Sequence, residues 1–309
     1  MHSTTKLIII GIIPFAIAAC GGSATTSLQP ESNFTRWGAI TANTEVIVGG
    51  VDIDGSYQWD SVTDKITSTS MGAASEGATY SATYDSSGKL LTAVIAPSGG
   101  TAVSFDSSID TIGSLVIDSA TDMLVSANGK NYALAPNPTT KGWDYQSYGT
   151  WVTGGGTGSG TAGVMSVGAK TTGANIPLTG TAVYRGNSGG RYVDTLGNYV
   201  FTHSDIYLAA DFSRNAVDFE SYNTKTTADL INIVDRTDLD FETQLSYSAA
   251  TNSLTGDNIP RGRRGLSDLT GTVTGRFYGP SAEEIGGVFK IDKAGADTIL
   301  YSAAFGGKQ

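Results

Sequence analysis

Cysteine and histidine are both scarce in this sequence. Its 309 residues include a single cysteine, Cys20, and 2 histidines, of which His2 falls in the N-terminal segment. One thiol excludes a disulfide scaffold, a zinc site built from cysteines and an iron–sulfur cluster. One histidine can hold a haem, but His203 alternates onto the strand face opposite Ile206 and Leu208 and is expected to face outward. We therefore expect no metal site and no cofactor.

Charge is low, and basic residues are in the minority. Charged residues make up 16% of the chain, and 19 lysines and arginines stand against 29 aspartates and glutamates, a formal net charge of −10. Nucleic-acid binding depends on a basic patch that meets the phosphates, so this balance excludes a nucleic acid as partner. An anionic membrane also repels an acidic surface, so attachment to a membrane needs a separate anchor.

Glycine, in contrast, is abundant, with 40 residues, and short runs of alternating apolar and polar side chains accompany it. Every second residue is apolar over 206–212, and over 239–247 the same alternation is interrupted only by Thr243. A period of two residues is typical of strands with one buried face, and no sustained helical period is present in the second half of the chain. The sequence therefore predicts an all-β fold made of many strands and tight turns.

Turn signals divide the chain into two parts. Turns are predicted at Asp54-Gly55, Ser87-Gly88 and Asn128-Gly129. The segment 135–138, Ala-Pro-Asn-Pro, cannot continue a strand ladder because proline donates no hydrogen bond. We place a domain boundary there, between a β-rich N-terminal domain at 31–138 and a second β-rich domain at 139–309.

The second domain is expected to be a closed barrel. It contains roughly eight strand-like segments, and closing such a sheet removes its exposed edges. The segments read as about five to eight residues each, shorter than the roughly 9–11 residues of a membrane-spanning strand. We therefore expect a soluble, antiparallel, eight-stranded barrel with its apolar face inside.

The N-terminal residues have the features of a secretory signal peptide. A basic residue, Lys6, precedes the short apolar run 7–17, and small residues follow. Residues 17–20, Ile-Ala-Ala-Cys, resemble the bacterial lipobox, in which the cysteine becomes the new N-terminus and receives acyl chains such as palmitate. We expect 1–19 to be removed, Cys20 to be lipidated and 20–30 to form a flexible tether. The alternative is an ordinary cleavage site beside a chance cysteine.

A specific motif stands near the end of the chain. Residues 275–289 read Gly-Arg-Phe-Tyr-Gly-Pro-Ser-Ala-Glu-Glu-Ile-Gly-Gly-Val-Phe. They resemble the signature of the transferrin-binding protein B β-barrel domain, and residues 145–151 and 178–186 resemble the first and second strands of that barrel. The resemblance covers residues 141–309, whereas 31–138 is similar only in general to the β-rich handle regions that precede these barrels. The signature residues are Gly275, Phe277, Tyr278, Gly279, Pro280, Glu284, Gly286, Gly287 and Phe289.

Each part of the signature can be given a structural task. Gly275 leaves room where strands approach closely, and Gly279-Pro280 ends a strand ladder. Residues 281–284 are expected to form a short helical turn with Ser281 as N-cap, which would brace one mouth of the barrel. Gly286-Gly287 is expected to supply the positive φ needed to return into a strand. The signature is therefore interpreted as architecture and not as a ligand site.

The resemblance also implies a function. Members of the family are lipid-anchored proteins of Gram-negative bacteria, many exported to the cell surface by Slam-type translocons, and several capture host iron or haem carriers for a TonB-dependent receptor. Gly21 follows the cysteine where an aspartate would retain the protein in the inner membrane, so sorting to the outer membrane is implied. We expect a non-enzymatic surface lipoprotein that binds an iron- or haem-carrying ligand, or another solute, for uptake.

Two other functions remain open. The chain could be a structural or adhesive lipoprotein without a role in transport. It could also carry an apolar ligand in the barrel lumen, although small barrels usually fill their interiors with side chains.

Three further motifs are candidate sites. Residues 186–190, Gly-Asn-Ser-Gly-Gly, fit a nucleophile elbow, but strands flank them and their composition is that of a hairpin loop. Asp52 and Asp54 open like a calcium loop but lack the later carboxylates. The cluster Arg261, Arg263 and Arg264 is a candidate contact patch for an acidic partner, or a solvated loop that balances nearby aspartates.

Overall fold

The chain adopts an all-β fold in the computed structural model, which describes residues 35–114, 121–228, 231–256, 261–262, 269–293 and 300–309. The helices of these residues are single turns: η1 (Trp37–Ala39), α1 (Pro138–Lys141), η2 (Gly173–Asn175) and η3 (Thr237–Leu239). Among the described residues no helix has the length and apolar character needed to span a bilayer. The predicted fold class is confirmed.

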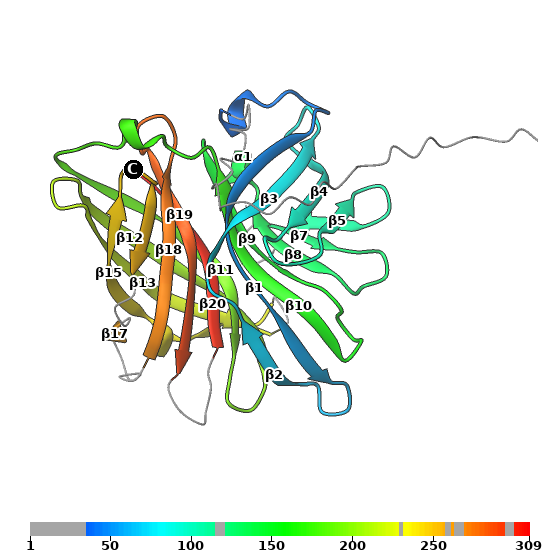
Figure 1. Cartoon of the computed structure of the whole chain (residues 1–309). Coiled ribbons are helices and arrows are strands. Elements are labelled where there is room, and N and C mark those ends of the chain that lie inside the picture. Colours follow the sequence, from blue (N-terminus) through cyan, green and yellow to red (C-terminus); the bar gives the residue numbers. More distant parts are fainter. Residues whose placement is uncertain (1–34, 115–120, 229–230, 257–260, 263–268, 294–299) are drawn as a thin grey trace, which may run out of the picture. The chain divides into compact units, whose positions relative to one another are not determined.

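The first half of the chain forms an open sheet, which we call the first sheet (Figure 1). Its strand order is β5-β4-β3-β1-β10-β9-β8-β7-β6, and β2 pairs with β1 beside this path. All of these pairs are antiparallel. The strands are β1 (Val46–Asp60), β2 (Lys65–Met71), β3 (Ser75–Tyr84), β4 (Leu90–Ala96), β5 (Val103–Asp106), β6 (Thr111–Ser114), β7 (Thr121–Val125), β8 (Tyr132–Pro136), β9 (Gln146–Val152) and β10 (Ser159–Gly168).

The second half forms a closed antiparallel barrel. The sheet runs in the order β13-β12-β11-β20-β19-β18-β16-β15, and pairing of β15 with β13 closes it, so the predicted eight-stranded barrel is confirmed. Two short strands pair with the barrel strands at its rim: β14 (Val234–Asp235) with β13, and β17 (Arg261–Gly262) with β15. The barrel strands are β11 (Thr181–Val193), β12 (Tyr199–Asp211), β13 (Ala216–Thr227), β15 (Phe241–Ser248), β16 (Ser253–Gly256), β18 (Leu269–Tyr278), β19 (Glu284–Lys293) and β20 (Leu300–Lys308).

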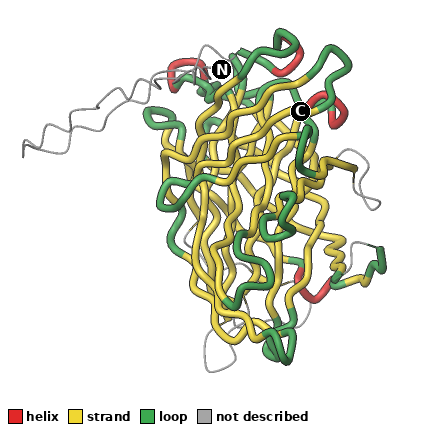
Figure 2. The backbone as a smooth tube through the Cα atoms, turned by 90° about the vertical axis from the view of Figure 1, so that its right-hand side faces the viewer, coloured by secondary structure: helices red, strands yellow, loops and turns green. Residues whose placement is uncertain are grey.

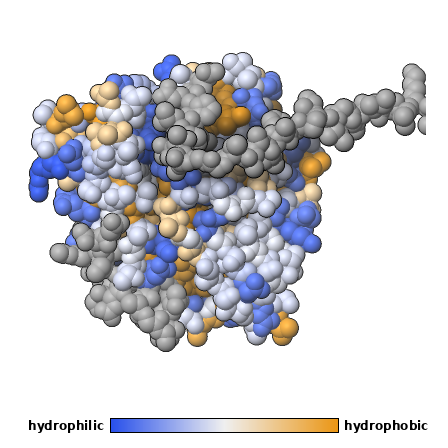
Figure 3. Space-filling view, viewed as in Figure 1, coloured by the Kyte–Doolittle hydropathy of each residue, from blue (hydrophilic) through white to orange (hydrophobic). Residues whose placement is uncertain are grey.

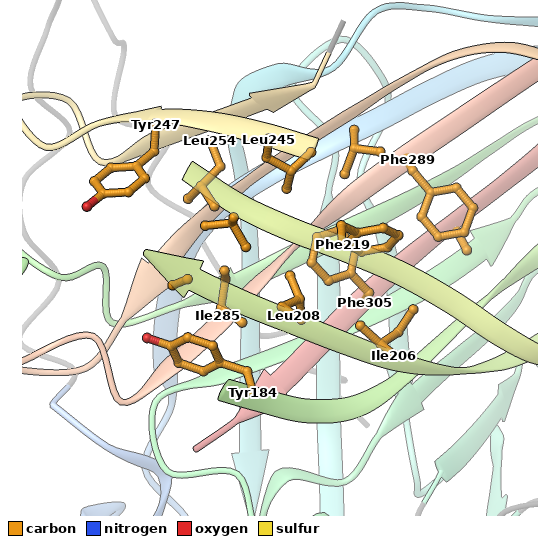
Figure 4. Close-up of a cluster of buried hydrophobic side chains, with 14 of the residues drawn as sticks. Tyr184, Ile206, Leu208, Phe219, Leu245, Tyr247, Leu254, Ile285, Phe289 and Phe305 are labelled. Atoms are coloured by element: carbon orange, nitrogen blue, oxygen red, sulfur yellow. The ribbon is translucent and has the colours of Figure 1, made fainter. Parts of the chain in front are cut away.

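Alternation sets the two faces of the barrel wall. Inward positions are buried and mostly apolar. Phe219 lies against Phe305, with ring centroids 4.9 Å apart (Figure 4), and against Phe241 at 5.5 Å. Outward positions of the same strands carry charge, including the exposed Asp218 and Glu242. Burial of the rings stabilises the barrel through the hydrophobic effect, and the carboxylates on the outer face remain solvated. This is the pattern expected of a barrel whose outer face is in water. The interior is filled with side chains, as predicted.

The first sheet packs against the outer wall of the barrel. Strands β9 and β10 lie beside β19 and β20 (Figure 1), and the turned view shows the strands running lengthwise between two ends that carry the loops (Figure 2). Val288 and Ala304, on the outside of the barrel, belong to the same hydrophobic cluster as the first sheet. The two sheets therefore share a core at this contact.

Strand β9 corrects one prediction. The segment 145–151 was expected to open the barrel, but β9 lies between β8 and β10 in the first sheet. A short alternating strand carries no sign of which sheet it joins, because that depends on partners far away in the sequence. Membership of the sheets changes after β10, and the division into domains at 138/139 stays a prediction.

One of the three predicted glycine-containing turns is wrong. Asp54 and Gly55 lie inside β1, a continuous strand of 15 residues, and not in a turn. A Cβ on Gly55 would fall 1.8 Å from the carbonyl oxygen of Ser70, so this glycine serves the close approach of β2. In contrast, Gly88 and Gly129 have positive φ and lie in the predicted hairpin turns.

Strand lengths were also underestimated. Strands β11 and β12 each contain 13 residues, because Gly186–Gly190 continues β11 instead of forming a loop. Length therefore does not argue against a membrane-spanning barrel, whereas the apolar interior and the charged exterior do.

Candidate binding surface and the family signature

The turn of the signature closes one end of the barrel. Ala282 is completely buried in the barrel core, and its carbonyl accepts the hydroxyl of Tyr184 at 2.7 Å and the amide of Gln309 at 2.9 Å. The turn braces a barrel mouth as predicted, but it is not helical. Gly279 and Ala282 have φ of +91° and +64°, a left-handed geometry that no helical turn contains.

Glu284 connects this turn to the first sheet. It is the first residue of β19, it is 0% exposed, and its carboxylate accepts the backbone N–H groups of residues 144–146 at 2.7, 2.9 and 2.9 Å. Burial raises the pKa of Glu284, while those hydrogen bonds and nearby Lys308 act to lower it. Lys308 also pairs with Asp144 at 2.6 Å. The signature acid therefore ties the barrel to the entrance of β9.

The signature glycines serve close packing. Gly286 and Gly287 lie within β19, and neither has a positive φ, which corrects the expected turn. A Cβ on Gly287 would lie 2.2 Å from the carbonyl oxygen of Thr274, and one on Gly275 would lie 2.6 Å from that of Gly286. Only glycine lets these backbones approach so closely, as predicted for Gly275.

The opposite mouth is closed by the segment around η3. Leu239 is buried in the barrel core, and the backbone N–H of Thr224 donates to the carboxylate of Asp240 at 2.9 Å. Arg236 stacks over the ring of Tyr192 at 4.8 Å and pairs with Asp238 at 2.7 Å. Side chains therefore close this mouth as well, and the filled lumen argues against the carriage of an apolar ligand.

The two ends of the barrel differ in what they present. One end, which we call the turn end, carries the turns 212–215, 249–252 and 279–283. The other, the loop end, carries the hairpin 194–198, and there β13, β16 and β19 end while β14, β18 and β20 begin. In the view of Figure 1 the loop end points downward.

Exposed aliphatic side chains also gather at the loop end. Figure 3 shows hydrophobic residues at the lower edge of the molecule, and others at its upper left and right. Leu178 and Val183, at the turn end, are exposed singly, which is ordinary for a surface. The aliphatic residues exposed at the loop end are Val62, Leu196, Ile231, Ile233 and Val234. A collection of such residues at one end marks a candidate surface for contact with another protein.

The residues predicted as sites fall in different places. Cys20 lies outside the described residues, as do Arg263 and Arg264. The backbone of Arg261 opens β17 and pairs with Glu242 at the loop end. The role of the arginine cluster as a contact patch stays a prediction.

The nucleophile-elbow motif does not form a catalytic pair. Ser188 is fully buried inside the barrel, where it pairs across the ladder with Ser204. His203 directly precedes Ser204 in β12, so its side chain points to the outer face of the wall. A base on the opposite face cannot reach the hydroxyl.

The paired hairpins at the loop end were not predicted from the sequence. The β1–β2 hairpin of the first sheet and the β11–β12 hairpin of the barrel meet where the backbone N–H of Ile66 donates to the carbonyl of Gly197 at 2.8 Å. Both tips have an aspartate two residues before an aliphatic residue, Asp60 before Val62 and Asp194 before Leu196. This repeated Asp-x-aliphatic pattern is the signal that could have indicated them.

The fold and the candidate surface are those of a closed β-barrel that is filled with side chains and packs against a second sheet. The family model described as C-lobe and N-lobe beta barrels of Tf-binding protein B matches residues 176–309. Residues 176–309 are therefore similar to the barrels of the transferrin-binding protein B-like family. The match begins shortly before β11, in agreement with the strand order and later than the predicted start near residue 141.

Solved structures of transferrin-binding protein B are similar to the chain at low identity. A mutant from Haemophilus parasuis Hp5 is 14% identical with a TM-score of 0.43, covering 86% of this chain and 76% of that one. The isotype 1 protein from serogroup B Neisseria meningitidis is 12% identical with a TM-score of 0.34, covering 86% and 77%. A mutant from Actinobacillus pleuropneumoniae H49 is 11% identical with a TM-score of 0.36, covering 83% and 98%. A search of curated proteins found no match.

Proposed function

We propose that this chain is a lipid-anchored surface lipoprotein of the outer membrane whose loop end binds a protein that carries iron or haem, or another solute, for uptake. The family of the barrel supports a binding role, since the similar solved structures are named for the binding of transferrin. The lipobox-like segment at Cys20 supports the anchor. A TonB-dependent receptor and a Slam-type translocon are the partners that such a role would need.

The observation that carries the proposal is that the described chain begins at one end of the barrel and the exposed aliphatic residues lie at the other. Trp37, near the start of the described chain, lies at the turn end, where its backbone N–H donates to Asp144 and its indole donates to the carbonyl of Gln146. Glu284 binds the same segment. Because the described chain begins at the turn end, the loop end is the end that would be free to contact a partner. The exposed aliphatic residues lie at that free end.

Binding without catalysis fits the groups that the barrel presents. Ser188 and His203 lie on opposite faces of the wall, and the lumen is filled. The exposed aliphatic residues of the loop end would equally suit adhesion to a neighbouring protein without transport. Uptake and adhesion therefore differ in the ligand and not in the surface.

The anchor and the ligand can be tested separately. In a Gram-negative host, the full chain should fractionate with the outer membrane and the Cys20→Ala variant should not. The purified acylated protein should then bind at least one of a panel of iron-loaded transferrin, iron-free transferrin and haem, measured by biolayer interferometry. Binding to none of these would contradict the role in iron uptake and favour adhesion, and a C20A variant that stays in the membrane would contradict the anchor.

A further inference from the structure

Two hairpins from different sheets form one rigid pair at the loop end. The β1–β2 hairpin and the β11–β12 hairpin are joined by the hydrogen bond from Ile66 to Gly197 at 2.8 Å. The ammonium of Lys65 also donates to the side-chain oxygen of Asn198. A backbone bond and a side-chain bond together fix the position of one tip relative to the other.

Gly197 makes this approach possible. Its φ is +78°, and a Cβ at this position would lie 2.4 Å from the carbonyl oxygen of Ile66. Any other residue would be strained in its backbone and would push the hairpins apart. The pairing is therefore built into the sequence of the β11–β12 tip.

Each tip holds one aliphatic side chain in water. A carboxylate oxygen of Asp60 accepts the N–H of Val62 at 2.8 Å, and a carboxylate oxygen of Asp194 accepts the N–H of Leu196 at 2.8 Å. These bonds order the turns while leaving Val62 91% and Leu196 74% exposed. Two ordered aliphatic side chains on adjacent tips can fill depressions on a partner with little loss of conformational entropy.

The surroundings of the tips are acidic overall, since residues 60–65 and 194–198 hold three aspartates and one lysine, Lys65. Asp60 and Asp194 stand two residues from the aliphatic side chains, and Asp64, on the β1–β2 tip, accepts the indole N–H of Trp59. The chain as a whole has a formal charge of −10. Such a surface is complementary to basic groups on a protein and is repelled by an anionic membrane.

We propose that the paired hairpins dock a folded protein through Val62 and Leu196, and that the docking site of this partner is an apolar depression rimmed by lysine and arginine. This inference rests on the proposed function, because it names the part of the loop end that makes the contact and the chemistry of the partner. Ile233, on the loop after β13, belongs to the same end but not to the pair.

The test uses the full acylated chain on intact cells. The photo-crosslinking residue benzoylphenylalanine replaces Val62, Leu196, Ile233 or Ser86, the last an exposed residue of the β3–β4 turn near α1. The proposal predicts an adduct with the same protein from positions 62 and 196, and none from position 86. Rising salt should reduce both adducts together, since the rim contacts are charged.

The effect of substitutions on binding affinity provides a quantitative test. Val62→Ser and Leu196→Ser should each weaken binding of the crosslinked protein about tenfold, as expected for anchor residues of an interface. Both side chains are exposed, so the melting temperature should not change. Gly197→Ala should weaken binding through the separation of the tips, although it removes no contact atom.

The outcomes separate this inference from the proposed function. Adducts from position 233 alone would overturn the docking site and leave binding at the loop end intact. Adducts with lipids from 62 and 196, or binding of the purified protein to vesicles containing phosphatidylglycerol, would overturn the protein partner in favour of a membrane. The absence of adducts from 62, 196 and 233 would contradict both proposals.

Discussion

The carboxylate of Glu284 accepts the backbone N–H of Tyr145 at 2.9 Å, although 139 positions separate the two residues in the sequence. One end of this contact is in the family signature and the other is at the entrance to the first sheet. The signature acid therefore holds two sheets together, and its buried charge is offset by three backbone donors and a nearby lysine. This arrangement explains why an acid suits a position in the wall of the barrel.

Replacement of Glu284 by glutamine should destabilise the fold. The amide nitrogen of glutamine cannot accept a hydrogen bond, so at least one of the three backbone N–H groups loses its partner in a buried place. The expected loss in the free energy of unfolding is about 1–3 kcal/mol, measured by chemical denaturation. Glu283→Gln is the control, because Glu283 is only partly buried and should cost less than about 0.5 kcal/mol. Equal losses in both variants would contradict the role of Glu284.

The contribution of Glu284 should depend on pH in a definite direction. Burial raises the pKa of Glu284 above its ordinary value of 4.5, so between these two values the folded protein binds the proton more tightly than the unfolded chain. The stability from this group is full below pH 4.5 and falls as the pH rises through the folded pKa. The difference in unfolding free energy between wild type and E284Q should therefore be larger near pH 4.5 than at neutral pH. A difference that grows with pH would mean that the hydrogen bonds outweigh burial.

Gly287→Ala should disturb the barrel wall. The added methyl group would lie 2.2 Å from the carbonyl oxygen of Thr274, and a backbone atom in a paired strand cannot move aside cheaply. Overpacking of this kind costs about 1–3 kcal/mol, seen as a lower midpoint of thermal or urea unfolding. Gly113→Ala, on β6, is the matched control, since a Cβ there meets nothing within 4 Å. If both variants unfold at the wild-type midpoint, close packing is not the reason for Gly287.

Arg191 should be replaceable by an apolar residue. Its side chain is buried between β11 and β9 at 2% exposure, and one guanidinium nitrogen donates to the carbonyl of Trp151 at 3.2 Å. Among the described residues its other two nitrogens make no hydrogen bond of standard geometry, and Tyr199 interacts with the guanidinium. Burying a charge with so few partners is costly, so Arg191→Met should keep or raise the free energy of unfolding, by up to about 2 kcal/mol.

Arg191→Ala serves as the companion variant, because it removes the charge and also leaves a cavity. It should unfold at a lower denaturant concentration than Arg191→Met. Similar large losses in both variants would show that the guanidinium is well satisfied in solution.

Periodicity in the sequence was sufficient to predict the barrel and its inward face. Phe241, Leu245 and Tyr247 alternate as predicted and are buried, because one face of each strand must leave water whatever its partner is. The family signature was sufficient to predict that the turn at 279–283 closes one mouth of the barrel. The pairing partners of the strands could not be predicted. Strand β9 was assigned to the barrel and not to the first sheet, because pairing depends on residues far away in the sequence.

Glycine was the main source of error. A glycine reads the same in sequence whether it supplies a positive φ, as Gly129 does, or a close approach of backbones, as Gly186 does beside the carbonyl of Gly306. The second use depends on a partner more than a hundred residues away. The paired hairpins were missed for the same reason, since Ile66 and Gly197 belong to hairpins of different sheets and lie far apart in the sequence.

The most direct test of the account blocks one end of the molecule at a time. With Cys20 acylated, a Ser61→Cys or Ser281→Cys variant has one free thiol, at the loop end or the turn end, to which a polyethylene glycol chain can be coupled. The account predicts that coupling at position 61 abolishes binding of the panel ligand and that coupling at position 281 leaves it unchanged. Binding that survives at 61 and is lost at 281 would contradict it.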